Sequence, residues 1–355
     1  MSELIQKHDN RATIRWKLLT GASALAFAAY VSSAACVEAK DATHPLIWLE
    51  LDGQFSMQKN DLEIYDPPFL SVSQFDAISH LGLEKTGPNI WDKGAAISLQ
   101  PEGSDWIFSA AIRYGRIGRS ERRLQITNSG FGNSYLGYLY LAYQDFRAKS
   151  SESHTIVDFS VGRDVGLGIF GSHASSNVSL GMRFSQFRSE NHAGFQSQPT
   201  NGDFYQPYNK FYASFDGKRG FQGIGPMISW DASTMIAGNP GDGGISLDWG
   251  VNGAVLFGRQ KMSEQHQTTK LHFGYHSYPP PTRYTPVSAS RSKKVTVPNL
   301  GAFAGVSWRY AAAKVTLGYR ADYFFGAIDG GIDTAKKEDR GFYGPFASIS
   351  VGIGD

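Results

Sequence analysis

Two consecutive segments near the end of the chain, 300–310 and 313–325, alternate between apolar and polar residues with a period of two. Side chains alternate across a β-strand, so each segment predicts a long strand with one apolar and one largely polar face. The short AAAK break between them predicts an antiparallel hairpin. Two environments fit this pattern. Either the apolar face meets lipid and the other face a wet lumen, or the apolar face meets the core of a soluble sandwich.

The same alternation recurs along the chain and predicts about twelve strands, with fourteen as an alternative. The predicted strands lie at 47–57, 95–100, 106–114, 156–165, 178–187, 205–215, 221–231, 245–257, 271–275, 300–310, 313–325 and 342–353. The breaks between them alternate in length. The long ones lie at 58–92, 117–153, 189–203, 233–243, 277–292 and 328–340, and the short ones lie near 103, 170, 218, 264 and 311.

An even-stranded antiparallel barrel with both chain ends in the periplasm predicts this order, with long extracellular loops and short periplasmic turns. A soluble sandwich has no reason to sort its connections by length. Lipid also requires every backbone polar group to be paired within the protein, so the sheet must close on itself. We therefore expect an all-β fold, an antiparallel transmembrane β-barrel that occupies residues 40–355 as a single domain.

The first 39 residues read as a signal peptide that is removed on export. Lys7, Arg11, Arg15 and Lys17 form a basic start, and an apolar run at 18–31 follows that is short for a membrane span. Cleavage is expected after Ala39, with Ala35 as the alternative. The lone cysteine, Cys36, would leave with this segment, so no disulfide framework is expected.

Composition and motifs argue against several functions. The formal net charge is +2, which implies no general attraction to nucleic acid or to anionic lipid, and no nucleic-acid partner is expected. The histidines scatter over predicted loops and strand ends, and no HExxH, GxSxG or paired-cysteine spacing occurs. We therefore expect no enzyme activity, no cofactor and no metal site.

The polar faces of the predicted strands carry eleven charged residues, and a charge that faced hydrocarbon would cost about 2–4 kcal/mol at the middle of the membrane. We expect these side chains to line the lumen. They could bias which solutes pass a water channel, or pair across a narrow lumen and plug it; twelve strands favour a narrow pore. The lumen-lining candidates are Glu50, Asp52, Arg113, Asp158, Arg183, Asp231, Asp248, Arg309, Lys314, Arg320 and Asp322.

Other side chains are candidates for contact with the lipid. Trp308 and Tyr310 are expected in the inner aromatic girdle, and Tyr323 and Phe325 in the outer one. A basic group after 114 could attract anionic solutes or outer-leaflet lipid phosphates, although a solvated loop is the simpler interpretation. That group consists of Arg116, Arg119, Arg122 and Arg123.

A family resemblance adds to this interpretation. The segments are FQGIGPMISWDAS (221–233), ISLDWGVNGAVLFGRQ (245–260), VTLGYRADYFFGAID (315–329) and RGFYGPFASISVGIG (340–354). The order GIGP, VLFG, LGYRADYFF, FYGPF resembles the Legionella major outer membrane protein family of porin-like barrels over 157–354. The resemblance implies an outer-membrane barrel that can form a pore, and it supplies no catalytic residues. The terminal VGIGD departs from the aromatic end that is common in such barrels.

The predicted function is a porin-like passive pore for small hydrophilic solutes or ions in the cell outer membrane of a Gram-negative bacterium. The alternative is a non-conducting surface, adhesion or structural barrel that acts through its extracellular loops. The expected partners are outer-membrane lipid and small solutes or ions. The sequence leaves a homo-oligomer possible and does not decide the oligomeric state, because it contains no recognisable interface signal.

Overall fold

The computed structural model describes residues 47–59, 90–102, 104–131, 139–165, 174–201, 208–239, 243–273, 282–283, 287–330 and 337–353. The predicted signal peptide and the start of the mature chain lie outside these residues. The strands are β1 (Ile47–Lys59), β2 (Ile90–Leu99), β3 (Trp106–Phe131), β4 (Leu139–Asp164), β5 (Ala174–Asn201), β6 (Tyr208–Asn239), β7 (Gly243–Phe273), β8 (Thr282–Arg283), β9 (Val287–Tyr310), β10 (Ala313–Asp329) and β11 (Lys337–Ile353).

The strands form one antiparallel sheet that closes on itself. Sequential strands pair from β1 to β7, β7 pairs with β9, and β9, β10 and β11 follow in order. The sheet closes where β1 pairs with β11, from Ile47 opposite Ile353 to Lys59 opposite Gly341. The two-residue β8 pairs only with β7, so ten long strands make the barrel in the part of the chain that the structure describes. The prediction of an antiparallel all-β barrel is confirmed.

The predicted number of strands is wrong, because two pairs of predicted strands are each one continuous strand. β6 runs through the DGKR segment at 216–219, and β7 runs through the polar segment at 261–268. Both segments contain residues that favour turns or solvent. They pair instead with strands on both sides, as Lys218 does with Glu190 and Ser263. Tertiary pairing therefore overrides the local turn signal, and twelve strands become ten.

The predicted lengths of several connections change for the same reason. The break predicted at 117–153 consists largely of the paired ends of β3 and β4, and the one at 189–203 largely of the end of β5. The long connection predicted at 233–243 shrinks, since β6 ends at Asn239 and β7 begins at Gly243. The predicted breaks at 117–153 and 189–203 are therefore mostly extended sheet, whereas most of the break predicted at 58–92 lies outside the described residues.

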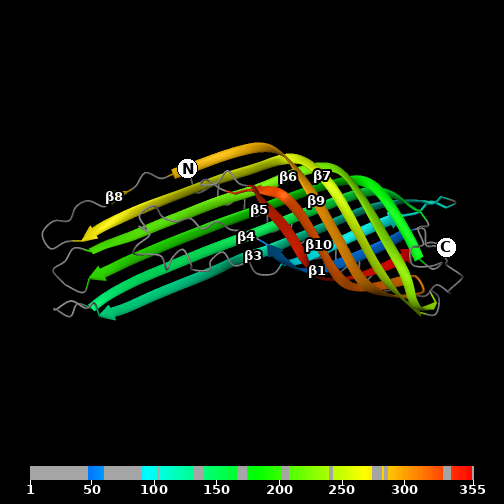
Figure 1. Cartoon of the computed structure of the whole chain (residues 1–355), viewed down its shortest axis with the longest axis horizontal. Coiled ribbons are helices and arrows are strands. Elements are labelled where there is room, and N and C mark those ends of the chain that lie inside the picture. The colour runs from blue at the N-terminus through cyan, green and yellow to red at the C-terminus, as the bar shows by residue number, and fades with distance from the viewer. Residues whose placement is uncertain are drawn as a thin grey trace, which may run out of the picture. The chain divides into compact units, whose positions relative to one another are not determined.

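The barrel has two unlike ends. We call the end where β1 begins and β11 finishes the terminal end, and the opposite end the far end. At the far end β3, β4, β5, β6, β7 and β9 continue well beyond β1, β2, β10 and β11, as Figure 1 shows for the long green and yellow arrows. Among the described residues, the part of β9 before Asn299 pairs with β7 alone. The far end therefore extends as a sheet of six strands along one side of the barrel.

Burial is inverted relative to a soluble protein. Leu180 is 65% exposed and Leu317 63% exposed, whereas Arg183 is 2% exposed and Asp322 3% exposed. An apolar exterior around a polar interior is the distribution that a membrane barrel requires, and it excludes the soluble sandwich. Among the described residues, no helix is long and apolar enough to cross a membrane.

Candidate functional site

The barrel interior gathers the charged residues that the alternation singled out. All eleven candidates are buried or half-buried. Several contact strands that are not their neighbours in the sheet. Arg113 of β3 reaches Asp322 of β10, and Arg183 of β5 reaches Asn299 of β9. Strands that do not pair can touch only across the inside of the barrel, so these contacts span the interior.

Arg183 is the centre of the widest interior network. Its guanidinium binds Asp158 with two hydrogen bonds of 2.7 Å, one from Nε and one from Nη2. Nη1 donates to Asn252 Oδ1 at 2.8 Å and to Asn299 Oδ1. The carboxylate of Asp322 lies 3.9 Å away. The planar guanidinium of Arg183 therefore contacts residues of four other strands, β4, β7, β9 and β10, as the bidentate geometry of arginine allows.

Three further ion pairs lie in the same interior. Arg113 Nη1 lies 2.5 Å from Asp322 Oδ2, and Arg320 Nη1 lies 2.6 Å from Asp52 Oδ2. Nearer the terminal end, Lys314 Nζ lies 2.5 Å from Asp248 Oδ2. Asp248 also accepts hydrogen bonds from three serines of β6, β7 and β9, which are Ser233, Ser246 and Ser307.

The three remaining candidates do not join these ion pairs. Glu50 accepts a hydrogen bond from Ser350 at 3.0 Å. Asp231 accepts one from Ser229 at 3.3 Å. Arg309 lies over the ring of Trp48 at 5.5 Å from its centroid. These residues form the polar wall near the terminal end.

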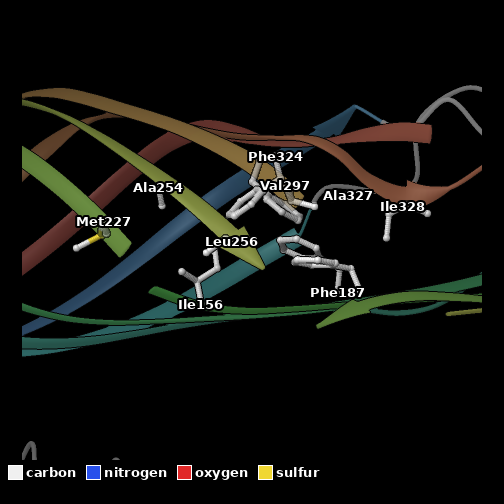
Figure 2. Packing of buried hydrophobic residues seen from close by; sticks show 11 residues of the cluster. Ile156, Phe187, Met227, Ala254, Leu256, Val297, Phe324, Ala327 and Ile328 are labelled. Atoms are coloured by element: carbon white, nitrogen blue, oxygen red, sulfur yellow. The ribbon is translucent and has the colours of Figure 1, made fainter. Parts of the chain in front are cut away.

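An apolar layer crosses the barrel beyond this network, toward the far end. In Figure 2 the side chains of Phe187, Leu256, Val297 and Phe324 converge from different strands into one cluster. The ring centroid of Phe187 lies 4.7 Å from that of Phe324 and 5.6 Å from that of Phe342. The cluster is formed by Ile156, Phe187, Phe221, Met227, Ala254, Leu256, Val297, Phe324, Ala327, Ile328 and Phe342.

Two facing glycines make room for one ring of this layer. Gly223 of β6 and Gly258 of β7 are paired across the sheet. A Cβ atom on Gly223 would lie 2.5 Å from the ring of Phe221, and one on Gly258 would lie 2.8 Å from it. The missing side chains therefore let Phe221 lie flat against the barrel wall, where it is 2% exposed.

A second polar layer closes the interior beyond the apolar one. Arg219 Nε lies 2.6 Å from Glu264 Oε1, and Arg219 Nη1 lies 3.3 Å from Glu338 Oε1 on β11. Arg340 Nη1 lies 3.5 Å from Glu152 Oε1 on β4. Further out, hydrogen bonds from Arg291 to Asp329 raise the pKa of that guanidinium above its ordinary value. Charge pairs therefore lie on both sides of the apolar layer.

One polar cluster beside the apolar layer resembles a hydrolase triad in composition only, and its His154 ring lies 4.1 Å from the ring of Phe342. Ser56, Asp92 and His154 come from β1, β2 and β4, and each is at most 5% exposed. Asp92 lies between the other two: Ser56 donates to it, and His154 Nε2 is 3.4 Å from it. A nucleophilic serine needs the histidine as its own hydrogen-bond partner. The order of contacts therefore does not fit acyl transfer.

Side chains at the level of the apolar layer are buried. The apolar layer has exposures of 0–6%. Near the apolar layer, Gln54, Ser56 and Asp92 are 3%, 0% and 5% exposed. These side chains are therefore largely closed to solvent. Among the described residues, no group of three or more His, Cys, Asp or Glu side chains is arranged to hold a metal ion.

The aromatic candidates lie on the outer face at the two ends of the hairpin. Trp308 and Tyr310 are 52% and 55% exposed, and their rings stack at 5.9 Å near the terminal end. Phe325 is 43% exposed and meets Tyr323 at 5.1 Å near the far end. This placement at the two limits of an apolar surface is typical of membrane-interface aromatics.

Sequence reasoning missed the apolar layer and the second polar layer. Phe324 and Phe342 stand on the polar parity of their strands, and apolar residues on that parity are the available signal. The sequence predicts turns at Arg219 and Glu264, so it does not predict that these side chains lie inside the barrel. For Arg119, Arg122 and Arg123, the structure describes only the backbone, within β3.

A closed antiparallel barrel with an apolar outer face and a polar, charge-paired interior defines the class of outer-membrane β-barrel proteins. The family model described as the Legionella pneumophila major outer membrane protein precursor matches residues 134–353. The chain belongs to this family, which confirms the resemblance seen in the sequence. The family places the protein in the outer membrane.

Solved structures give only distant likenesses, and no curated protein sequence matches significantly. A bacterial polysaccharide outer membrane secretin shares 9% identity at a TM-score of 0.18, over 88% of this chain and 99% of the other. A TodX monoaromatic hydrocarbon channel mutant shares 8% sequence identity at a TM-score of 0.20, over 86% of this chain and 90% of the other. The Ralstonia pickettii toluene transporter TbuX shares 10% sequence identity at a TM-score of 0.16, over 87% of this chain and 89% of the other. Likenesses this low carry no conclusion about function.

Proposed function

We propose that this protein is a plugged outer-membrane barrel, which anchors an extended sheet at the cell surface and does not conduct hydrated solutes in this conformation. One observation supports the proposal: the apolar layer at Phe187, Leu256, Val297 and Phe324 is buried inside the barrel, with charge-paired layers on either side of it. A hydrated ion that crossed this level would lose its water without gaining polar ligands.

The alternative is the porin-like pore for small hydrophilic solutes or ions, which stays a prediction. The polar wall of the interior favours it, since the eleven charged candidates are the side chains that would line such a lumen. Conduction would then require movement of Phe324 and its neighbours away from the barrel axis. The balance of charge pairs favours the plug.

The orientation of the barrel is part of the proposal. Both chain ends of the described barrel lie at the terminal end, and the two-residue turn between β9 and β10 lies there too. Membrane barrels of this kind keep short turns in the periplasm and longer segments outside the cell. We therefore place the far end, with its six long strands, outside.

Conductance of the refolded full-length mature chain in planar bilayers tests the plug. The native protein is expected to be silent. The triple variant Phe187→Ala, Phe324→Ala, Phe342→Ala removes three rings that contact one another across the interior, so it is expected to show discrete current steps. Steps from the native protein at low voltage would contradict the plug and establish the pore.

A matched control separates opening from general damage. Phe159 and Phe257 are 59% and 57% exposed on the outer face. Phe159→Ala and Phe257→Ala also remove rings, but they leave the interior intact and should stay silent. Heat-modifiable gel migration verifies that each variant is folded before its conductance is compared. A folded, silent triple variant would overturn the assignment of the apolar layer as the barrier.

A further inference from the structure

The outer face of β3 to β9 changes character abruptly at one level, toward the far end. The register aligns one residue from each strand into a row. The last apolar row is Ile112, Val157, Phe184, Ile224, Phe257 and Thr296. The next outward row is Tyr114, Thr155, Gln186, Gln222, Arg259 and Lys294, and the one after it is Arg116, Ser153, Arg188, Gly220, Lys261 and Ser292. Five cations therefore stand directly above the apolar surface.

Three of these cations lie close together on the outer face. Arg259 and Lys294 are direct cross-strand partners, and Lys261 is two residues from Arg259 on the same face. All three are exposed. Like charges directly opposite in a sheet are destabilising. Within the described part of the chain, none of the three has an ion pair, so an anion from outside would relieve their repulsion.

The other two cations border a polar cavity. Arg116 and Arg188 flank Ser153, and together with Tyr114 they line a cavity of about 320 Å³ on the outer side of β3 to β5. Glu152 and Glu190 also line it. Arg188 donates to Glu190 at 2.7 Å, whereas Arg116 has no ion pair among the described residues. The cavity therefore offers one free guanidinium and one that an anion could share.

In the part of the chain that the structure describes, the terminal end of the outer face has no such group. Its exposed Arg163 is paired with Asp105 at 2.7 Å. Lys314 and Arg309 at that end are half-buried on the inner face. Among the described residues, unpaired outward cations therefore collect at one membrane boundary only. A generally basic surface would not show this asymmetry.

We propose that this basic rim, defined as Arg116, Arg188, Arg259, Lys261 and Lys294, binds the phosphate groups of a multiply phosphorylated lipid in the outer leaflet. The apolar row below receives the acyl chains, and the cations above meet the phosphates. Basic residues beside a membrane surface attract anionic headgroups, and arginine binds phosphate in a bidentate manner. A soluble anion would have no use for the adjoining apolar row. The inference rests on the proposed orientation for its choice of leaflet.

Native mass spectrometry of the refolded full-length mature chain tests the proposal, with bis-phosphorylated lipid A, mono-phosphorylated lipid A and phosphatidylcholine as probes. The native protein is expected to retain them in that order. Two variants test the rim: Arg259→Gln with Lys294→Gln, and Arg116→Gln with Arg188→Gln. Each is expected to lower affinity for bis-phosphorylated lipid A by about tenfold. Rising salt should weaken binding by the native protein more than by either variant.

The control removes two exposed guanidiniums that lie away from the rim. Arg147 and Arg163 each lie near a carboxylate, at 3.6 Å and 2.7 Å, so Arg147→Gln with Arg163→Gln matches the charge change. It should leave lipid retention unchanged. Equal losses in control and test variants, or equal retention of lipid A and phosphatidylcholine, would overturn the rim. Full displacement by millimolar inorganic phosphate would point to a free-anion site and overturn the lipid assignment.

Binding in detergent does not depend on conductance or orientation. A native protein that conducts would refute the plug and leave the lipid measurement intact. A reversed barrel would keep its affinity for lipid A and would differ only in which end is labelled on intact cells.

Discussion

Arg183 shows how a charge is accommodated inside this barrel. It is 2% exposed, and its donors reach Asp158, Asn252 and Asn299. A buried guanidinium is tolerated only when its hydrogen bonds are made and its charge is balanced. The parity of the strand predicts that Arg183 points inward. Its partners lie on β4, β7 and β9, and their identity depends on the closed sheet.

Asp322 is the carboxylate that links the two central arginines. It lies 2.5 Å from Arg113 and 3.9 Å from Arg183. Asp322→Asn removes its charge and leaves part of two buried cations uncompensated. We expect it to lower the free energy of unfolding by about 3 kcal/mol. Urea unfolding of the refolded protein in detergent, followed by tryptophan fluorescence, measures the change.

Asp105→Asn is the control for this change. Asp105 pairs with Arg163 at 2.7 Å, but its side chain is 71% exposed. An exposed ion pair contributes about 0–1 kcal/mol. Equal effects of the two substitutions would show that the interior network is solvated and does not bear on stability.

At the scale of the element, the β9–β10 hairpin is the part that the sequence describes best. Tyr310 pairs with Ala313 and the ladder continues to Asn299 opposite Phe324. The predicted antiparallel hairpin with its tight break is therefore confirmed. The turn consists of Ala311 and Ala312, and Ala311 has a φ of 49°. A side chain in this left-handed region is strained, and glycine is the residue that two-residue hairpin turns prefer there.

Ala311→Gly should relieve this strain. We expect a gain of about 1 kcal/mol in the free energy of unfolding, because the cost of a left-handed residue with a Cβ is of that order. The same substitution at Ala312, which has no positive φ, should be neutral or destabilising. Urea unfolding of both variants checks the difference. A loss of stability in Ala311→Gly would refute the strained turn.

β6 and β7 show where local pattern fails. Lys218 and its neighbours look like a turn, since aspartate, glycine and charged residues interrupt the alternation of apolar residues. In the structure this segment lies within the 32-residue strand β6 and pairs with β5 and β7. Beyond the apolar belt an outward strand face no longer needs apolar residues. The alternation therefore fades while the strand continues.

At the scale of the whole molecule, the closed sheet decides both the contacts on which the proposed plug rests and the asymmetry of the two ends. Closure between β1 and β11 brings Arg340 to Glu152 and Arg320 to Asp52 across the interior. The extension of β3 to β9 makes the far end much longer than the terminal end (Figure 1). The proposed orientation follows from this asymmetry and can be tested in intact cells.

Single cysteines at the two ends report the orientation. The chain has one cysteine, in the predicted signal peptide, so an introduced cysteine would be the only one in the mature protein. Ser290→Cys lies in the far-end part of β9, and Ala311→Cys lies in the turn at the terminal end; both positions are exposed. A membrane-impermeant maleimide is expected to label only Ser290→Cys on intact cells.

Permeabilised cells provide the control for this experiment. After the outer membrane is opened, both cysteines should react. Labelling of Ala311→Cys alone on intact cells would show that the barrel has the opposite orientation. The basic rim would then belong to the other leaflet.

The sequence by itself determined the class of fold, because a two-residue period records which side chains face outward wherever the outer face must be apolar. It also placed eleven charged residues, from Glu50 to Asp322, on the inward parity. The number of strands, the apolar layer around Phe324 and the basic rim were decided only by the tertiary structure. Each depends on register and closure between strands that are distant in sequence, and no local pattern encodes those pairings.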